Sequence, residues 1–177
     1  MLIKSYSERL ARHAAKHSLI LNFLRDETWS STQVLTKLLE GTPALTSKTM
    51  SQLEGQGHVA KHRPEPLRQL LWGITPHGLA HAWSDDEVMQ VRAHFEPSKL
   101  SPLAVPHHLT IQLARINAKR AGWSDWTPES LLPRGLAKRP DAVVLAPDGR
   151  KVAIEVERHV KTLKRYEAIF SAYLQAI

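Results

Sequence analysis

The chain of 177 residues contains no cysteine. It can therefore form neither a disulfide framework nor a thiolate metal site, and this absence fits a cytosolic protein. No run of about 18 apolar residues occurs, so no membrane-spanning helix is predicted. The N-terminal segment lacks the apolar stretch of a signal peptide. Aromatic residues make up only 6% of the chain, and its five tryptophans are scattered, so we expect them to pack in the core.

Basic residues are in excess, and the excess is uneven. The chain has 24 Lys and Arg against 17 Asp and Glu, which gives a formal charge of +7. Residues 1–97 hold 11 basic and 10 acidic side chains, whereas residues 98–177 hold 13 and 7. Such a balance favours a polyanionic partner and points to nucleic acid.

A change in organisation occurs near residue 97. Pro97, Pro102 and Pro106 interrupt any regular element there, after the acidic step Asp85-Asp86-Glu87. No internal repeat or low-complexity tract is evident. We therefore predict two domains, comprising residues 1–97 and residues 98–177.

The first half alternates helical patterns with a small hairpin. Apolar periodicity predicts a helix over residues 4–25 and a second helix capped by Ser30 or Ser31. A third helix is expected to start at a cap on Thr46 or Ser47 and to end at Gly55 or Gly57. Strands over residues 59–63 and 70–74 follow, and Thr75-Pro76 opens a further helix.

This order resembles a winged helix-turn-helix domain, and its most specific part is the strand-to-helix junction from Trp72 to Ala80. The resemblance implies that the third helix enters the major groove and that the wing contacts phosphates. The residues it would place against DNA are Ser47, Lys48, Thr49, Ser51 and Gln52 on the helix and Lys61, His62, Arg63 and Arg68 on the wing. A winged helix used for protein contacts remains the alternative.

The second half contains a predicted hairpin that carries acidic residues. Its turn, residues 146–150, has Pro147 and Gly149 at positions that suit a three-residue loop. This turn sets Leu145 opposite Lys151, and therefore Asp141 opposite Glu155. Alternation then places Asp141, Glu155 and Glu157 on one face, and Val144, Val152, Ile154 and Val156 on the other. A divalent cation between the carboxylates would relieve their repulsion.

The second half is expected to contain a helix from His107 to about Gly122, then this hairpin, then a helix from His159 onward. This order resembles the core of PD-(D/E)XK nucleases. The fold class expected is therefore α+β, with an N-terminal winged helix-turn-helix followed by a nuclease-like α/β domain. Because so small a sheet is marginally stable, we expect a further strand beyond residue 177. The resemblance implies Mg²⁺ or Mn²⁺ held by Asp141, Glu155 and the carbonyl of Val156.

The nuclease motif departs from its pattern at Glu157, which stands where a lysine is expected. Lys161 or Lys164 could reach back to supply the missing positive charge; alternatively, Glu157 itself binds metal or orients water. Arg139, Arg158 and Arg165 would form a basic rim for the phosphate backbone.

The most specific motif residues lie between positions 138 and 166, from Lys138-Arg139-Pro140-Asp141 to Lys164-Arg165-Tyr166. With them, the sequence resembles the MobC family of plasmid mobilisation relaxases across nearly the whole chain. This resemblance implies a bacterial cytoplasmic protein that nicks DNA at a plasmid transfer origin to start conjugative transfer. It also implies accessory mobilisation proteins and a coupling protein as partners. The alternative is a DNA-binding accessory protein or repressor whose nuclease-like fold does not cut.

Overall fold

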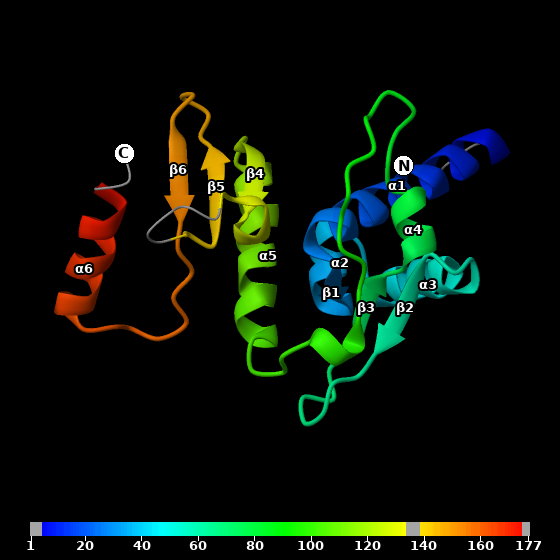
Figure 1. The fold of residues 1–177 in the computed structure, drawn as a ribbon. Coiled ribbons are helices and arrows are strands. Elements are labelled where there is room, and N and C mark those ends of the chain that lie inside the picture. The colour runs from blue at the N-terminus through cyan, green and yellow to red at the C-terminus, as the bar shows by residue number, and fades with distance from the viewer. Residues whose placement is uncertain (1–4, 134–138, 175–177) are drawn as a thin grey trace. The chain divides into compact units, whose positions relative to one another are not determined.

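The computed structural model describes residues 5–133 and 139–174. Within them the chain is α+β, with six α-helices and two three-stranded antiparallel sheets (Figure 1). Lys138, part of the MobC resemblance, lies outside the described residues. No helix in the described ranges is both long and apolar enough to cross a membrane.

Two compact units divide the chain between Gln112 and Leu113, later than the boundary predicted near residue 97. Helix α5 (Val105–Arg120) explains the difference, because its first half belongs to the first unit. The buried Gln112 side chain accepts a hydrogen bond from Ser30 Oγ at 2.6 Å and donates one to the Trp29 carbonyl at 2.7 Å. These contacts keep residues 98–112 with the first unit.

Helix α1 (Tyr6–Glu27) closely matches the predicted helix over residues 4–25. It starts with a capping box, in which the Ser5 hydroxyl accepts from the Glu8 amide and the Glu8 carboxylate accepts from the Ser5 amide. Its buried residues begin only at Ile20. The C-terminal half of α1 is therefore the part that packs into the core.

Helices α2 (Thr32–Leu38) and α3 (Pro43–Gly55) form the helix-turn-helix. Ser31 caps α2, as one of the two predicted caps. The cap predicted for α3 at Thr46 or Ser47 is wrong: the Thr42 hydroxyl accepts from the Leu45 amide, and Pro43 occupies the first turn. Proline has no amide to satisfy at that position, so Thr42-Pro43 starts α3 a full turn earlier.

The first sheet has the strand order β1-β3-β2, formed by β1 (Trp29–Ser31), β2 (Val59–His62) and β3 (Leu71–Ile74). Both outer strands pair antiparallel with β3. The predicted strands over residues 59–63 and 70–74 are confirmed to within one residue, whereas β1 was not predicted. Strand β1 is only three residues long, and its pairing with β3 rather than a local pattern makes it extended.

Helix α4 (Pro76–Ala80) follows β3 through the predicted junction. The Thr75 hydroxyl caps it by accepting from the Gly78 amide at 2.9 Å. A Cβ on Gly78 would lie 2.0 Å from the His58 carbonyl oxygen, so only glycine fits there. The order α1-β1-α2-α3-β2-β3 with this three-stranded sheet is the topology of a winged helix, and its core includes Leu24, Leu35, Met50, Leu53, Leu71 and Ile74, all 0% exposed.

A short 3-10 turn, η1 (Pro97–Lys99), precedes α5. The second unit contains the rest of α5, β4 (Ser124–Pro128), the turn η2 (Glu129–Leu131), β5 (Ala142–Leu145), β6 (Lys151–Ile154) and α6 (Leu163–Leu174). Its strands are ordered β4-β5-β6.

Strand β4 was not predicted from the sequence. Its register shifts between Ser124 and Thr127, and Asp125 has φ of 52°, so it shows no clean alternation in the sequence. Helix α6 begins at Leu163, not at His159 as predicted.

Candidate functional site

The acidic hairpin has the predicted register. Val143 pairs with Ala153, Leu145 pairs with Lys151, and the Ala146 amide donates to the Arg150 carbonyl at 2.8 Å. Gly149 takes the left-handed conformation with φ of 86° that the turn requires. The prediction that the Pro-Asp-Gly turn fixes this pairing is confirmed.

Regular pairing ends at Ala142 and Ile154, so Asp141 and Glu155 lie just beyond the ladder. Asp141 Oδ2 accepts a hydrogen bond from the Val156 amide at 2.7 Å. The strand was predicted to continue through Glu157, and this part is wrong, because β6 ends at Ile154 and residues 155–157 belong to no strand. Strand pairing therefore does not fix the side to which Glu155 and Glu157 point.

Each remaining carboxylate of the predicted trio has a partner within the second unit. Glu155 accepts a hydrogen bond from the Tyr173 hydroxyl, and Glu157 forms an ion pair with Lys161. Lys161 thus reaches back to the acidic segment, as one of the two predicted lysines, while Lys164 is exposed on α6.

The trio does not converge as a compact ligand group. Across residues 5–133 and 139–174, the three carboxylates do not form a set whose ligand atoms all lie within 4.8 Å of one another. Binding of Mg²⁺ or Mn²⁺ by Asp141, Glu155 and the Val156 carbonyl, and catalysis by the lysines, stay predictions.

The predicted basic rim of the second unit is accessible to solvent. Arg139, Arg158 and Arg165 are all exposed. The Arg139 guanidinium lies 3.0 Å from the Glu129 carboxylate, and it keeps further donors for other partners.

In the first unit, α3 has an inner and an outer face. Thr46, Thr49, Met50 and Leu53 are buried, whereas the outer face comprises the exposed residues Ser47, Lys48, Ser51 and Gln52. Thr49 was predicted to face DNA, and that prediction is wrong: it is 4% exposed, and its hydroxyl donates to the Leu45 carbonyl at 3.0 Å. Gln52 Oε1 lies 2.9 Å from His13 Nε2 on α1.

The wing is the loop from Arg63 to Leu70 together with the ends of β2 and β3, which it joins (Figure 1). Lys61, Arg63 and Arg68 are exposed on it. Lys61 also lies 3.3 Å from Glu54 at the end of α3. His62 is half-buried against Phe95, with ring centroids 5.9 Å apart, so its ring packs on its own unit.

Three histidines that the sequence did not single out lie together at the end of the β2–β3 hairpin opposite the wing. The rings of His58, His77 and His81 have centroids between 4.5 and 5.0 Å apart. The spacing of His77 and His81, four residues apart on one helical turn, is the one local signal that could have found them.

Comparisons with known proteins give one distant likeness. No protein-family description matches the sequence, and no curated protein matches it. Among solved structures, an apo double mutant of Lactococcus lactis ZitR is similar, with 17% identity and a TM-score of 0.36, over 64% of this chain and 73% of that one. The description of the first unit as a winged helix rests on its element order and strand order.

Proposed function

We propose that this protein binds double-stranded DNA through its winged helix, as a DNA-binding regulator or accessory protein. Helix α3 would lie in the major groove, and the wing would contact the phosphate backbone. The observation that carries this proposal is the division of α3 into a buried apolar face and an exposed polar face beside an exposed basic wing.

The outer face of α3 has the chemistry for reading base edges. Lysine pairs with guanine, glutamine with adenine, and serine can bond to either, so Lys48, Gln52 and Ser51 can each contribute to recognition. Gln52 would have to exchange its contact with His13 for a base. Glu54 does not oppose the DNA backbone directly, because its carboxylate is paired with Lys61.

Electrostatic attraction by the first unit is modest. Lys48, Lys61, Arg63 and Arg68 are the basic side chains on its proposed DNA-binding face. Because Lys61 is paired with Glu54, the other three would each neutralise one phosphate, and the slope of log K against log salt would be about −3. Residues of the second unit that join the complex would make the slope steeper.

The test is the salt dependence of binding to a labelled mixed-sequence duplex, followed by fluorescence anisotropy. Lys48→Ala and Arg63→Ala should each weaken binding and reduce the salt slope by about 1. Lys99→Ala is the matched control, because Lys99 is exposed on η1 and belongs to neither α3 nor the wing. Wild-type slopes and affinities in both variants would contradict binding by the winged helix.

A second candidate is metal-dependent nicking of DNA by the second unit, at a plasmid transfer origin if the likeness to MobC extends to activity. Two observations favour it. The hairpin register brings Asp141 and Glu155 to the same end of the β5–β6 ladder, and Lys161 reaches the neighbouring Glu157. A cation there would meet oxygen ligands, which Mg²⁺ and Mn²⁺ prefer.

Nicking is tested with supercoiled plasmid and Mn²⁺. Asp141→Asn and Glu155→Gln should abolish it, whereas Asp148→Asn, at the exposed tip of the same hairpin, should not. Equal nicking by all variants would exclude this site. Loss of nicking with intact binding would separate the two functions.

A further inference from the structure

We propose that His58, His77 and His81 form a binding site for a divalent transition metal, with Zn²⁺ as its representative ion. The site belongs to the first unit alone and is independent of the acidic hairpin. It does not depend on the proposed binding of DNA.

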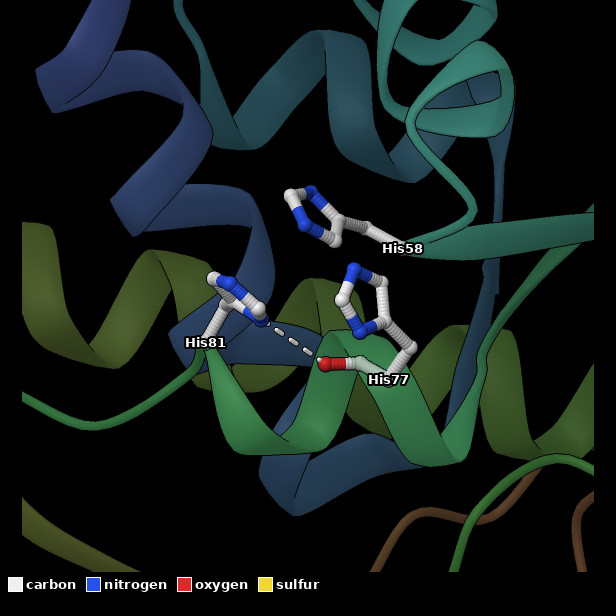
Figure 2. A group of neighbouring side chains, drawn as sticks. All are labelled: His58, His77 and His81. Carbon is white, nitrogen blue, oxygen red and sulfur yellow. Dashed lines mark hydrogen bonds between the residues drawn. The ribbon is translucent and has the colours of Figure 1, made fainter.

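The three imidazoles converge from two elements. His58 lies between the end of α3 and the start of β2, while His77 and His81 come from one turn of α4 and its C-terminal cap. Figure 2 shows the three rings turned toward one another. One ligand nitrogen from each ring can be chosen so that all three lie within 4.8 Å of one another.

Only small movements would close this group around an ion. A tetrahedral ion with bonds of about 2.0–2.1 Å to nitrogen needs ligand atoms roughly 3.3 Å apart. His77 and His81 are exposed, so their side chains can rotate by the required distance without disturbing the core. The bond between His81 Nδ1 and the His77 carbonyl, 3.0 Å long, orients one of the two rings (Figure 2) and leaves its Nε2 as the ligand.

The donor set selects the kind of metal. Imidazole nitrogen suits Zn²⁺, Cu²⁺ and Ni²⁺, whereas Mg²⁺ and Ca²⁺ require oxygen ligands. Three histidines with water in the fourth position are an established Zn²⁺ coordination. No carboxylate belongs to the group among the described residues, so the site offers nothing specific to the harder cations.

His58 provides a second, independent indication of a missing partner. Its Nδ1 is buried and has no hydrogen-bond partner within the described part of the chain. A buried polar atom without a partner costs free energy, and a metal ion is one way to satisfy it.

The site would connect the segment between α3 and β2 with helix α4. The His58 amide donates to the Leu53 carbonyl in α3, and the His58 carbonyl accepts from the Thr75 amide, which precedes α4. A metal held by His58, His77 and His81 would add a cross-link between the same segments. Bound metal should therefore stabilise the first unit against unfolding.

The experiment is equilibrium titration of the full chain with Zn²⁺ against a chromophoric chelator, with Mg²⁺ in a parallel arm. We expect one equivalent of Zn²⁺ and no competition from Mg²⁺. Loss of even an indirect partner costs roughly 10- to 100-fold in metal affinity, so His77→Gln and His81→Gln should each weaken Zn²⁺ binding at least about tenfold. His94→Gln is the matched control, because His94 is exposed in the same unit but outside the group.

A direct readout accompanies the titration. On addition of Zn²⁺, the ring ¹⁵N resonances of His58, His77 and His81 should shift together, while that of His94 stays in place. The proposal is overturned if Zn²⁺ does not bind, if it binds equally to wild type and to both exposed-histidine variants, or if His94→Gln loses as much affinity. Because these two substitutions are at exposed positions, the result does not depend on whether His58→Gln folds.

Discussion

Phe95 lies directly over Gly73, so closely that a Cβ on Gly73 would be 2.0 Å from Phe95 Cγ. Gly73 is in β3, the central strand of the first sheet, and the Phe95 amide donates to the carbonyl of the next residue, Ile74, at 2.9 Å. The segment after α4 thereby covers the sheet, and glycine is what permits the contact.

Gly73→Ala should therefore destabilise the protein by about 1–3 kcal/mol, because the ring of Phe95 and the strand must separate to admit a methyl group. The free energy of unfolding in urea measures the effect. Gly55→Ala is the control: apart from its chain neighbours and the backbone of its own helix, no atom lies within 4 Å of its Cβ position at the end of α3, so alanine there should be neutral or stabilise by up to about 1 kcal/mol. Equal stability of the two variants would contradict the close packing of Phe95.

Gln112→Ala should cost about 2 kcal/mol or more. Ser30 is 0% exposed, and the substitution leaves its hydroxyl and the Trp29 carbonyl without their partner in the core. Thermal unfolding monitored by circular dichroism gives the comparison with Gln33→Ala, an exposed position on α2. A change equally small in both variants would mean that the first half of α5 is not anchored by this residue.

Thr49→Ala and Ser51→Ala should separate stability from recognition on the same helix. The Thr49 side chain is buried and bonded to the Leu45 carbonyl, so its loss should destabilise the fold by about 1 kcal/mol and leave the DNA affinity of the folded protein unchanged. Ser51 is exposed, so its loss should leave stability unchanged and weaken DNA binding. Urea denaturation measures the stability of both variants, and fluorescence anisotropy measures their affinity for DNA. If Thr49→Ala weakened DNA binding and Ser51→Ala weakened only stability, α3 would not present this face to DNA.

Glu87 should stabilise the folded protein by an amount that depends on pH in the acidic range. Hydrogen bonds, first from the Ser84 amide and then from the Arg25 side chain, lower the pKa of Glu87 to about 2. Because the pKa is lower in the folded than in the unfolded state, this contribution is complete above the ordinary value of 4.5 and is lost as pH falls toward 2. Carboxyl ¹³C titration by NMR should give a midpoint near 2, and Arg25→Gln should raise it. A wild-type midpoint near 4.5 would show that these bonds do not form.

Local signals were enough to predict much of the architecture. The Pro-Asp-Gly turn set the register of the hairpin, because the loop length determines which residues face each other. Thr75, Pro76 and Gly78 predicted the start of α4 with its cap. By contrast, β1 and β4 were missed, since three residues in one case and a shifted register in the other leave no periodic pattern.

The candidate sites were less predictable than the elements that carry them. Thr49 was assigned to DNA although it precedes Leu53 by four residues and follows Thr46 by three, so the helical period places it on the buried face of α3. Glu155 and Glu157 were assigned to one face by extending β6 beyond Ile154, where the strand ends. For the two glutamates the end of the strand, a boundary that the local sequence encodes poorly, removed the basis of the assignment.

The sequence by itself determined the order of the helices and of strands β2, β3, β5 and β6, the register of the acidic hairpin and the uneven positive charge, because each follows from neighbouring residues. Only the tertiary structure decided that residues 98–112 belong with the first unit, that Phe95 covers Gly73, and that His58 meets His77 and His81. These contacts join segments distant in the chain, and such contacts depend on how the elements pack, which no local pattern specifies.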